Sequence, residues 1–187
     1  MRMFTMLCCA AALSAGPVGI GEKLDSVTVE DSNAKRTEFS LRGKTSVVIF
    51  YSTVCPISND YNDRLSAFYR DYTAKGVQVI FADANSNESW KQMTDHAKDA
   101  GFAFPIYRDP SNALADQLGA TVTPETFVFD KDGVLRYHGN VDDSRNPARA
   151  QVTGLRTAAD EVLAGKPVSK TETKAFGCTI KRVRRAS

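Results

Sequence analysis

The segment FYSTVCPISNDY, residues 50–61, places a single cysteine directly before a proline. Apolar and β-branched residues lead up to Cys55, and Pro56 suits the first turn of a helix, where its missing N–H has no intrahelical partner anyway. A sulfur at this point faces unpaired backbone N–H groups and the positive end of the helix dipole. Such surroundings lower the pKa of a cysteine from about 8.5 to roughly 3.5–7.5. The segment therefore predicts that Cys55 is a nucleophile.

A buried cysteine that packs as a small apolar residue is the alternative for Cys55. Its position favours reactivity, because a residue between the end of a strand and the start of a helix is expected at the surface edge of the sheet. Ser58 stands where a second cysteine would complete a Cys-x-x-Cys pair. An outside thiol or a distant cysteine must therefore resolve any mixed disulfide that forms on Cys55.

The N-terminus bears on the cysteine count. Residues 1–16 combine Arg2, an apolar run and small residues in the order of a secretory signal peptide. We predict that this segment is removed and that the mature protein is periplasmic or secreted; an apolar N-terminus of a cytoplasmic protein is the alternative. Removal leaves Cys55 and Cys178, an even number that allows one disulfide in an oxidising compartment.

Strand and helix patterns alternate around the cysteine. Continuous apolar runs predict strands buried on both faces, and spacing of three and four predicts helices. A Lys-Asp-Gly turn joins the last two strands into a hairpin. Together they predict one α/β domain over residues 20–165, with a mixed sheet flanked by helices, and an extended polar tail over 166–187. The expected strands are 26–29, 39–41, 45–53, 77–83, 104–109, 125–130 and 134–139, and the expected helices are 57–72, 85–101, 111–119 and 147–164.

Composition narrows the range of partners. The chain is 42% hydrophobic and 25% charged with a net charge of +2, and its basic cluster lies at residues 181–185 instead of along a face that could follow phosphates. We expect no nucleic-acid partner. The N-terminal apolar run is too short to span a bilayer, so no membrane span is expected. No cofactor is predicted.

A second signal is the pair Thr123-Pro124 immediately before a predicted strand. An X-Pro bond is the one that readily adopts cis, and a cis bond here would turn the backbone sharply. A trans proline that begins an edge strand is the alternative.

In order and spacing, residues 24–164 resemble the thioredoxin superfamily. Within it they are most similar to exported, peroxiredoxin-like redoxin-domain proteins, the alkyl hydroperoxide reductase and thiol-specific antioxidant family in the broad sense. The segments that carry the resemblance are 55–61, 85–87, 104–133, 139–143 and 177–182.

The resemblance implies a thioredoxin-like fold and a thiol–disulfide oxidoreductase. Cys55 would be the nucleophile and Pro124 a cis proline that forms the wall facing the substrate. The partners would be protein or small-molecule thiols and disulfides. The supporting residues would be Thr53, Pro56, Ser58 and Thr123.

Cys178 is the candidate resolving cysteine within the mature chain. The polar segment between Gly165 and Cys178 reaches about 43 Å if fully extended, enough to cross the domain. Gly177 is expected to give the backbone freedom next to it. A permanent structural disulfide with Cys55 and a free thiol in the tail are the alternatives.

Two further functions stay open. A thiol peroxidase acting on hydroperoxides would oxidise Cys55 to a sulfenic acid that Cys178 resolves. Ser52 then supplies a hydroxyl three residues before the cysteine, but Val48 replaces the proline of the peroxiredoxin pattern. A non-catalytic binding or metal-carrier module is the other function. One site cysteine with His138 supplies few ligands, and His96 is expected in solvent, so no metal is predicted.

Overall fold

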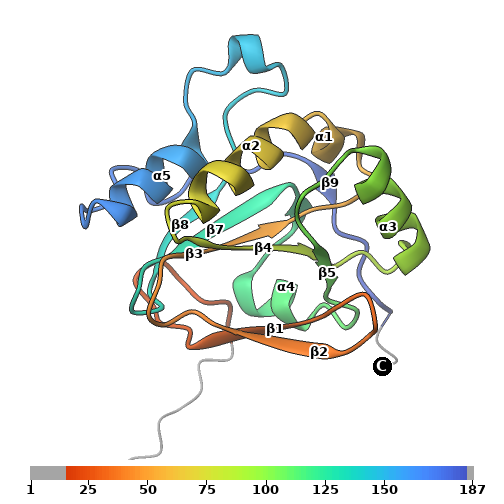
Figure 1. Ribbon diagram of the computed structural model, residues 1–187. Coiled ribbons are helices and arrows are strands. Elements are labelled where there is room, and N and C mark those ends of the chain that lie inside the picture. The colour runs from red at the N-terminus through yellow and green to blue at the C-terminus, as the bar shows by residue number, and fades with distance from the viewer. Residues whose placement is uncertain (1–15, 185–187) are drawn as a thin grey trace, which may run out of the picture.

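The structure, a computed structural model, describes residues 16–184 (Figure 1). The predicted signal peptide therefore lies outside the described residues except for Gly16. Seven strands form one mixed sheet in the order β2-β1-β5-β4-β3-β7-β8, and β6 and β9 pair separately. The strands are β1 (Ser26–Glu30), β2 (Arg36–Ser40), β3 (Ser46–Phe50), β4 (Gln78–Asp83), β5 (Ile106–Arg108), β6 (Val122–Thr123), β7 (Glu125–Phe129), β8 (Leu135–Gly139) and β9 (Cys178–Thr179).

The central strand β3 is buried along its whole length, as its continuous apolar run predicts. It runs parallel to β4 and antiparallel to β7, and β7 continues into β8 through the predicted hairpin. Alternate side chains of β3 enter two different apolar clusters, because successive residues of a strand point to opposite faces. Val47 and Ile49 belong to one cluster, and Val48 and Phe50 to the other.

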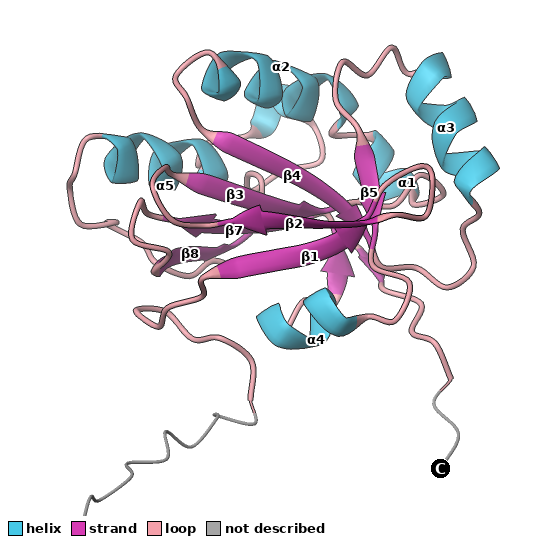
Figure 2. Ribbon diagram, turned by 60° about the horizontal axis from the view of Figure 1, so that its bottom comes forward, coloured by secondary structure: helices cyan, strands magenta, loops and turns pink. Residues whose placement is uncertain are grey.

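Helices cover both faces of the sheet. The helices α2 and α5 pack on one face and α4 on the other (Figures 1 and 2). Among residues 16–184, no helix is both long and apolar enough to cross a membrane. The mixed sheet with helices on both faces confirms the predicted α/β fold. The helices are α1 (Pro56–Asn59), α2 (Asn62–Thr73), α3 (Trp90–Asp99), α4 (Ala113–Leu118) and α5 (Gly154–Leu163), with a 3₁₀ turn η1 (Pro147–Arg149).

Two helices that the sequence predicts as continuous are interrupted. The helix expected over 57–72 divides at Tyr61, whose N–H bonds to the Ser58 carbonyl three residues back and so tightens the turn. The helix expected over 147–164 begins as η1 and returns to extended backbone at Ala150 before α5 starts. The spacing of apolar residues does not reveal either break, because apolar residues keep the helical period across a single tight turn.

Gly154 begins α5 where the helix meets β8 closely. A Cβ at this position would overlap the Tyr137 hydroxyl and the Asn140 side chain. The Tyr137 hydroxyl donates to the Asn140 main-chain carbonyl at 2.8 Å and to the Asn140 side-chain oxygen at 3.1 Å, and these bonds hold both side chains in place. The absence of a side chain at Gly154 therefore allows α5 to dock.

We expect Gly154→Ala to lower the free energy of unfolding by about 1–3 kcal/mol, the usual cost of overpacking a filled interior. Urea unfolding measures the change. Gly19→Ala is the matched control, because a Cβ there would make only ordinary contacts, at 3.7 Å or more, with the Glu22 side chain. Equal stability of the two variants would show that α5 can shift without cost.

Candidate active site

Cys55 lies in the turn between β3 and α1, at the N-cap of the helix. Pro56 occupies the first helical position, and the Ser58 N–H donates to Cys55 Sγ at 3.4 Å. The sulfur therefore receives one of the N–H groups that a helix leaves unpaired at its start. This is the local geometry that the Cys-Pro sequence predicts.

Cys178 lies in β9 and forms a disulfide with Cys55, with Cα atoms 5.9 Å apart. The strand β9 pairs antiparallel with β6, so that Cys178 stands opposite Thr123. Figure 1 shows the blue C-terminal segment passing beside α1 at this point. The tail thus closes over the cysteine. Cys55 is only 2% exposed, which corrects the expectation of a cysteine at the surface edge of the sheet.

The Thr123–Pro124 peptide bond is cis and lies beside the disulfide. The Thr123 carbonyl oxygen is 3.4 Å from Cys55 Sγ. A Cβ on Gly177 would overlap that same carbonyl group. Gly177 does not have a positive φ. Glycine is therefore needed at this position because it lacks a side chain, and not because of the backbone freedom expected from the sequence.

Hydrogen bonds attach the rest of the tail to the domain. The Lys181 N–H donates to the Asn85 side chain at 2.8 Å, and the Val183 N–H donates to the Asn112 side chain at 2.8 Å. The Ile180 side chain is buried in the apolar cluster around α4. Before Cys178, the Thr173 N–H donates to the His138 carbonyl at 3.1 Å. The segment is therefore held in place on both sides of Cys178, a docking that the polar sequence of the tail does not predict.

Glu125, next to the cis proline, is buried and anchors β6. Its carboxylate accepts the N–H groups of Thr121 at 2.7 Å and Val122 at 3.0 Å, and lies 2.6 Å from His138 Nε2. Burial opposes ionisation, but the bonds from His138 and from the two N–H groups outweigh it and hold the pKa of Glu125 below its usual value. The charged carboxylate thus stiffens the strand on which β9 docks.

Two hydroxyl groups near the disulfide are buried and have no hydrogen-bond partner among the described residues. They belong to Ser58 and Thr123, the residues that contact Cys55 Sγ. Thr53, two residues before Cys55, instead donates its N–H to Glu88 at 2.8 Å and its hydroxyl to the same carboxylate. The structure therefore brings all of the predicted site residues into one region of the fold.

The histidines do not join this site. His96 is not in solvent as expected: its Nε2 lies 2.8 Å from the Tyr51 hydroxyl, and burial lowers its pKa. His138 pairs with Glu125. Within residues 16–184, no group of three His, Cys, Asp or Glu side chains is arranged to hold a metal ion.

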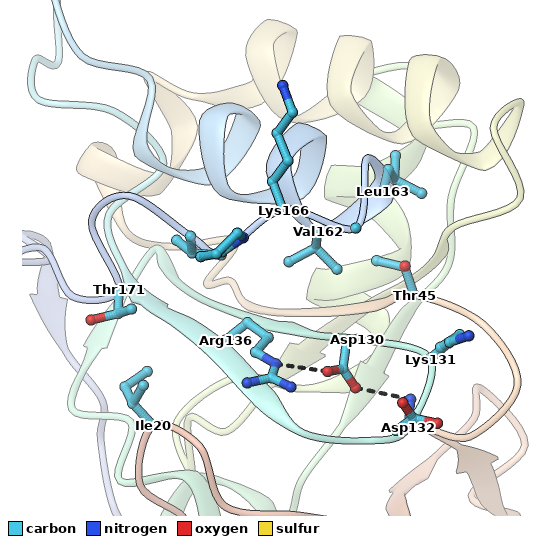
Figure 3. Close-up of a pocket in the computed structure, with 13 residues that line it drawn as sticks. Ile20, Thr45, Asp130, Lys131, Asp132, Arg136, Val162, Leu163, Lys166 and Thr171 are labelled. Atoms are coloured by element: carbon cyan, nitrogen blue, oxygen red, sulfur yellow. Dashed lines mark hydrogen bonds and ion pairs between the residues drawn. The ribbon is translucent and has the colours of Figure 1, made fainter.

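A cavity of about 620 Å³ lies away from the cysteines, between the end of α5 and the β7–β8 hairpin (Figure 3). Arg136 and Asp130, which pair at 2.7 Å, form part of its wall, with Val162 and Lys166 opposite. No sulfur lines it. This cavity is therefore separate from the disulfide.

The fold and the cysteine turn define a thioredoxin-like protein. The chain belongs to the AhpC/TSA family, whose model matches residues 20–138. This confirms the resemblance to redoxin-domain proteins.

Two solved structures share the architecture. A hypothetical protein from Sinorhizobium meliloti 1021 is 30% identical with a TM-score of 0.78, over 90% of this chain and 97% of that chain. An uncharacterised conserved protein from Geobacillus kaustophilus is 26% identical with a TM-score of 0.80, over 90% of this chain and 94% of that chain.

Among curated proteins, the chain is similar to thiol-disulfide oxidoreductase ResA of Bacillus thuringiensis (strain Al Hakam). The two are 27% identical over 115 residues. The match spans 61% of this chain and 65% of the relative, slightly less than two thirds of its length.

Sequence reasoning assigned no role to Glu125, Glu88 or Asn85. Asn85 and Glu125 fall within segments that carry the family resemblance, and that is the one signal the sequence offers for them. Glu88 has no such signal, because it acts through contacts with Ser52 and Thr53 that only folding brings near.

We expect Gly177→Ala to weaken the docking of β9 on β6, since a methyl group must displace the Thr123 carbonyl. A cost of about 1–3 kcal/mol corresponds to a disulfide about 5- to 150-fold easier to reduce at equilibrium. Titration with dithiothreitol, followed by alkylation of free thiols, measures it. Thr179→Ala, an exposed change in the same strand, should titrate like the wild type. Superimposable titrations for Gly177→Ala and Thr179→Ala would contradict the expectation.

Proposed function

We propose that this protein is an exported thiol–disulfide oxidoreductase in which Cys55 is the nucleophile and Cys178 resolves the mixed disulfide. The observation that carries the proposal is the Cys55–Cys178 disulfide, placed at the N-terminus of α1 and against the cis proline. The AhpC/TSA membership and the similarity to a curated thiol-disulfide oxidoreductase support it.

The surroundings of Cys55 favour its thiolate. When the disulfide opens, the Ser58 N–H already points at the sulfur, and Pro56 begins the helix whose dipole stabilises negative charge there. The buried hydroxyl groups of Ser58 and Thr123, which have no partner among the described residues, belong to the two residues whose backbone atoms contact the sulfur. A stabilised thiolate is both the attacking group and a good leaving group.

The proposed cycle balances as two successive exchanges. The Cys55 thiolate attacks a substrate disulfide, forms a mixed disulfide and releases one substrate thiolate. The Cys178 thiolate then attacks Cys55 Sγ, forms the internal disulfide and releases the second substrate thiolate. Two electrons have passed from the protein to the substrate, and Pro124 forms the wall along which the substrate chain lies.

Regeneration starts at Cys178. Cys55 is 2% exposed, whereas Cys178 is only partly buried, so a thiolate from a reducing partner reaches Cys178 first. Its attack expels Cys55 as the stabilised thiolate, and a second partner thiol then frees Cys178. The partners are protein or small-molecule thiols and disulfides in the periplasm or outside the cell, where the signal-like N-terminus would deliver the protein.

The other functions have less support. In a peroxidase the Ser52 hydroxyl would serve Cys55, but it donates to Glu88 at 2.5 Å. In a metal carrier His138 would be a ligand, but it pairs with Glu125. A permanent structural disulfide is the strongest competitor, because hydrogen bonds hold the tail on both sides of Cys178.

Single-cysteine variants separate exchange from a structural role. We expect Cys178→Ser to attack an aromatic disulfide and retain a stable mixed disulfide, because Cys55 remains an activated thiolate. Its alkylation rate should titrate below the ordinary cysteine pKa of about 8.5. Cys55→Ser should form that adduct far more slowly, and alkylation of its remaining thiol, Cys178, should titrate at the ordinary cysteine pKa. Mass spectrometry and rapid alkylation against pH provide the measurements.

The two outcomes against the proposal are distinct. A Cys178→Ser thiol that titrates near 8.5 would refute the activated nucleophile. A wild-type disulfide that resists excess dithiothreitol, together with loss of folding in both variants, would assign the disulfide a purely structural role.

A further inference from the structure

Two acidic side chains are buried behind the cysteine turn. Asp83 ends β4 and is 1% exposed, and Glu88 follows in the loop before α3 and is 2% exposed. The proposed exchange cycle uses neither. Buried carboxyl groups are costly unless they are hydrogen-bonded or protonated, so their partners show what the pair contributes.

Glu88 binds the turn that carries Cys55. It accepts the Ser52 hydroxyl at 2.5 Å and the Thr53 N–H at 2.8 Å, as well as the Thr53 hydroxyl. The Ser52 carbonyl in turn accepts the Cys55 N–H at 3.4 Å. The position of the nucleophile therefore depends on this carboxylate.

Asp83 binds the segment that carries Cys178. One of its oxygens accepts the backbone N–H of Asn85 at 2.7 Å and the side-chain amide of Asn85 at 2.9 Å. The side-chain oxygen of Asn85 accepts the Lys181 N–H at 2.8 Å, and the Ser86 N–H donates to the Lys181 main-chain carbonyl at 2.8 Å. Lys181 lies three residues beyond Cys178, so this chain of bonds reaches the second cysteine.

One oxygen of Asp83 is left without a donor. This oxygen is buried and has no hydrogen-bond partner among the described residues, and the side chain of Glu88 is close enough to raise the pKa of Asp83. Two buried carboxylates so close together cannot both ionise easily. Burial, and then the charge of Glu88, raise the pKa of Asp83 to about 7.

The groups that chiefly set the pKa of Asp83 include no cation. Tyr51, after β3, and His96, on α3, feel the charge of Glu88, and both are uncharged at pH 7 because burial raises the pKa of the tyrosine and lowers that of the histidine. On β5, the Arg108 guanidinium lies over the Trp90 ring. In the tail, the Lys181 side chain is exposed.

We propose that Asp83 and Glu88 are positioning residues that share one proton, join the Cys55 turn to the Cys178 tail, and make the exchange equilibrium depend on that proton. The inference rests on the proposed function. Reduction by two thiols yields Cys55 and Cys178 thiols and one external disulfide. The Cys55 thiolate adds a negative charge near the pair, so the reduced protein holds the shared proton more tightly than the oxidised protein.

The pH dependence follows from this difference. Where the oxidised protein has lost the proton and the reduced protein keeps it, reduction takes up one proton more than the cysteines require. The equilibrium then moves toward the disulfide by about an additional tenfold per pH unit. This window begins near pH 7 and extends upward.

The test compares variants in glutathione redox buffers from pH 6 to pH 9, with the dithiol fraction measured by alkylation and mass spectrometry. Asp83→Asn and Glu88→Gln keep the side-chain shape but cannot share a proton between two carboxyl groups. We expect both to lack the additional slope above pH 7. Asp132→Asn, an exposed change in the β7–β8 turn, is the matched control and should keep it.

Asn85→Ala separates the link to the tail from the proton. It leaves both carboxyl groups in place but removes a hydrogen bond that lowers the pKa of Asp83, so we expect it to favour the dithiol and to keep the additional slope, with the onset of that slope at higher pH. Difference infrared spectra of the oxidised protein add an independent readout: a protonated carboxyl band should disappear above pH 7 in the wild type and be absent in Asp83→Asn.

Parallel pH profiles for the wild type, Asp83→Asn and Glu88→Gln would overturn this inference and leave the oxidoreductase intact. A wild-type infrared spectrum without that band would also overturn it. No exchange by the wild type at any pH would overturn the proposed function as well.

Discussion

The two-residue pairing of β9 with β6 holds Cys178 against Cys55, because Thr123 contacts both: it stands opposite Cys178 and its carbonyl lies 3.4 Å from Cys55 Sγ. So short a ladder is not stable alone. It depends on Glu125, whose buried carboxylate binds the backbone of β6, and on Gly177, whose missing side chain lets the tail approach the cis proline. The site is therefore built jointly by the domain and its C-terminal tail.

The parallel part of the sheet explains why buried acids can reach the cysteine turn. The strands β3 and β4 are parallel and adjacent, so their carboxyl ends open at the same edge. The turn with Cys55 follows β3, and the loop from Asp83 to Glu88 follows β4. Side chains that are distant in the sequence thus meet where the two strands end, and the tail crosses the same edge.

Much of the fold was predictable because its causes are local or periodic. The buried strands, the β7–β8 hairpin and the helices that cover the sheet follow from apolar spacing and from turn residues. The same reasoning missed the breaks near Tyr61 and Ala150, where the backbone turns without disturbing the apolar period. It also misplaced His96, whose ring meets Tyr51 from a different element.

The sequence by itself determined that Cys55 begins a helix after a buried strand, since Pro56 and the apolar run before it act on their own neighbourhood. It also named Cys178 as the remaining cysteine for a pair. Only the tertiary structure decided that the two are bonded, that the tail buries Cys55, and that Asp83 and Glu88 lie behind the turn. These features depend on hydrogen bonds between side chains and backbone groups far apart in the chain, which leave no period or motif in the sequence.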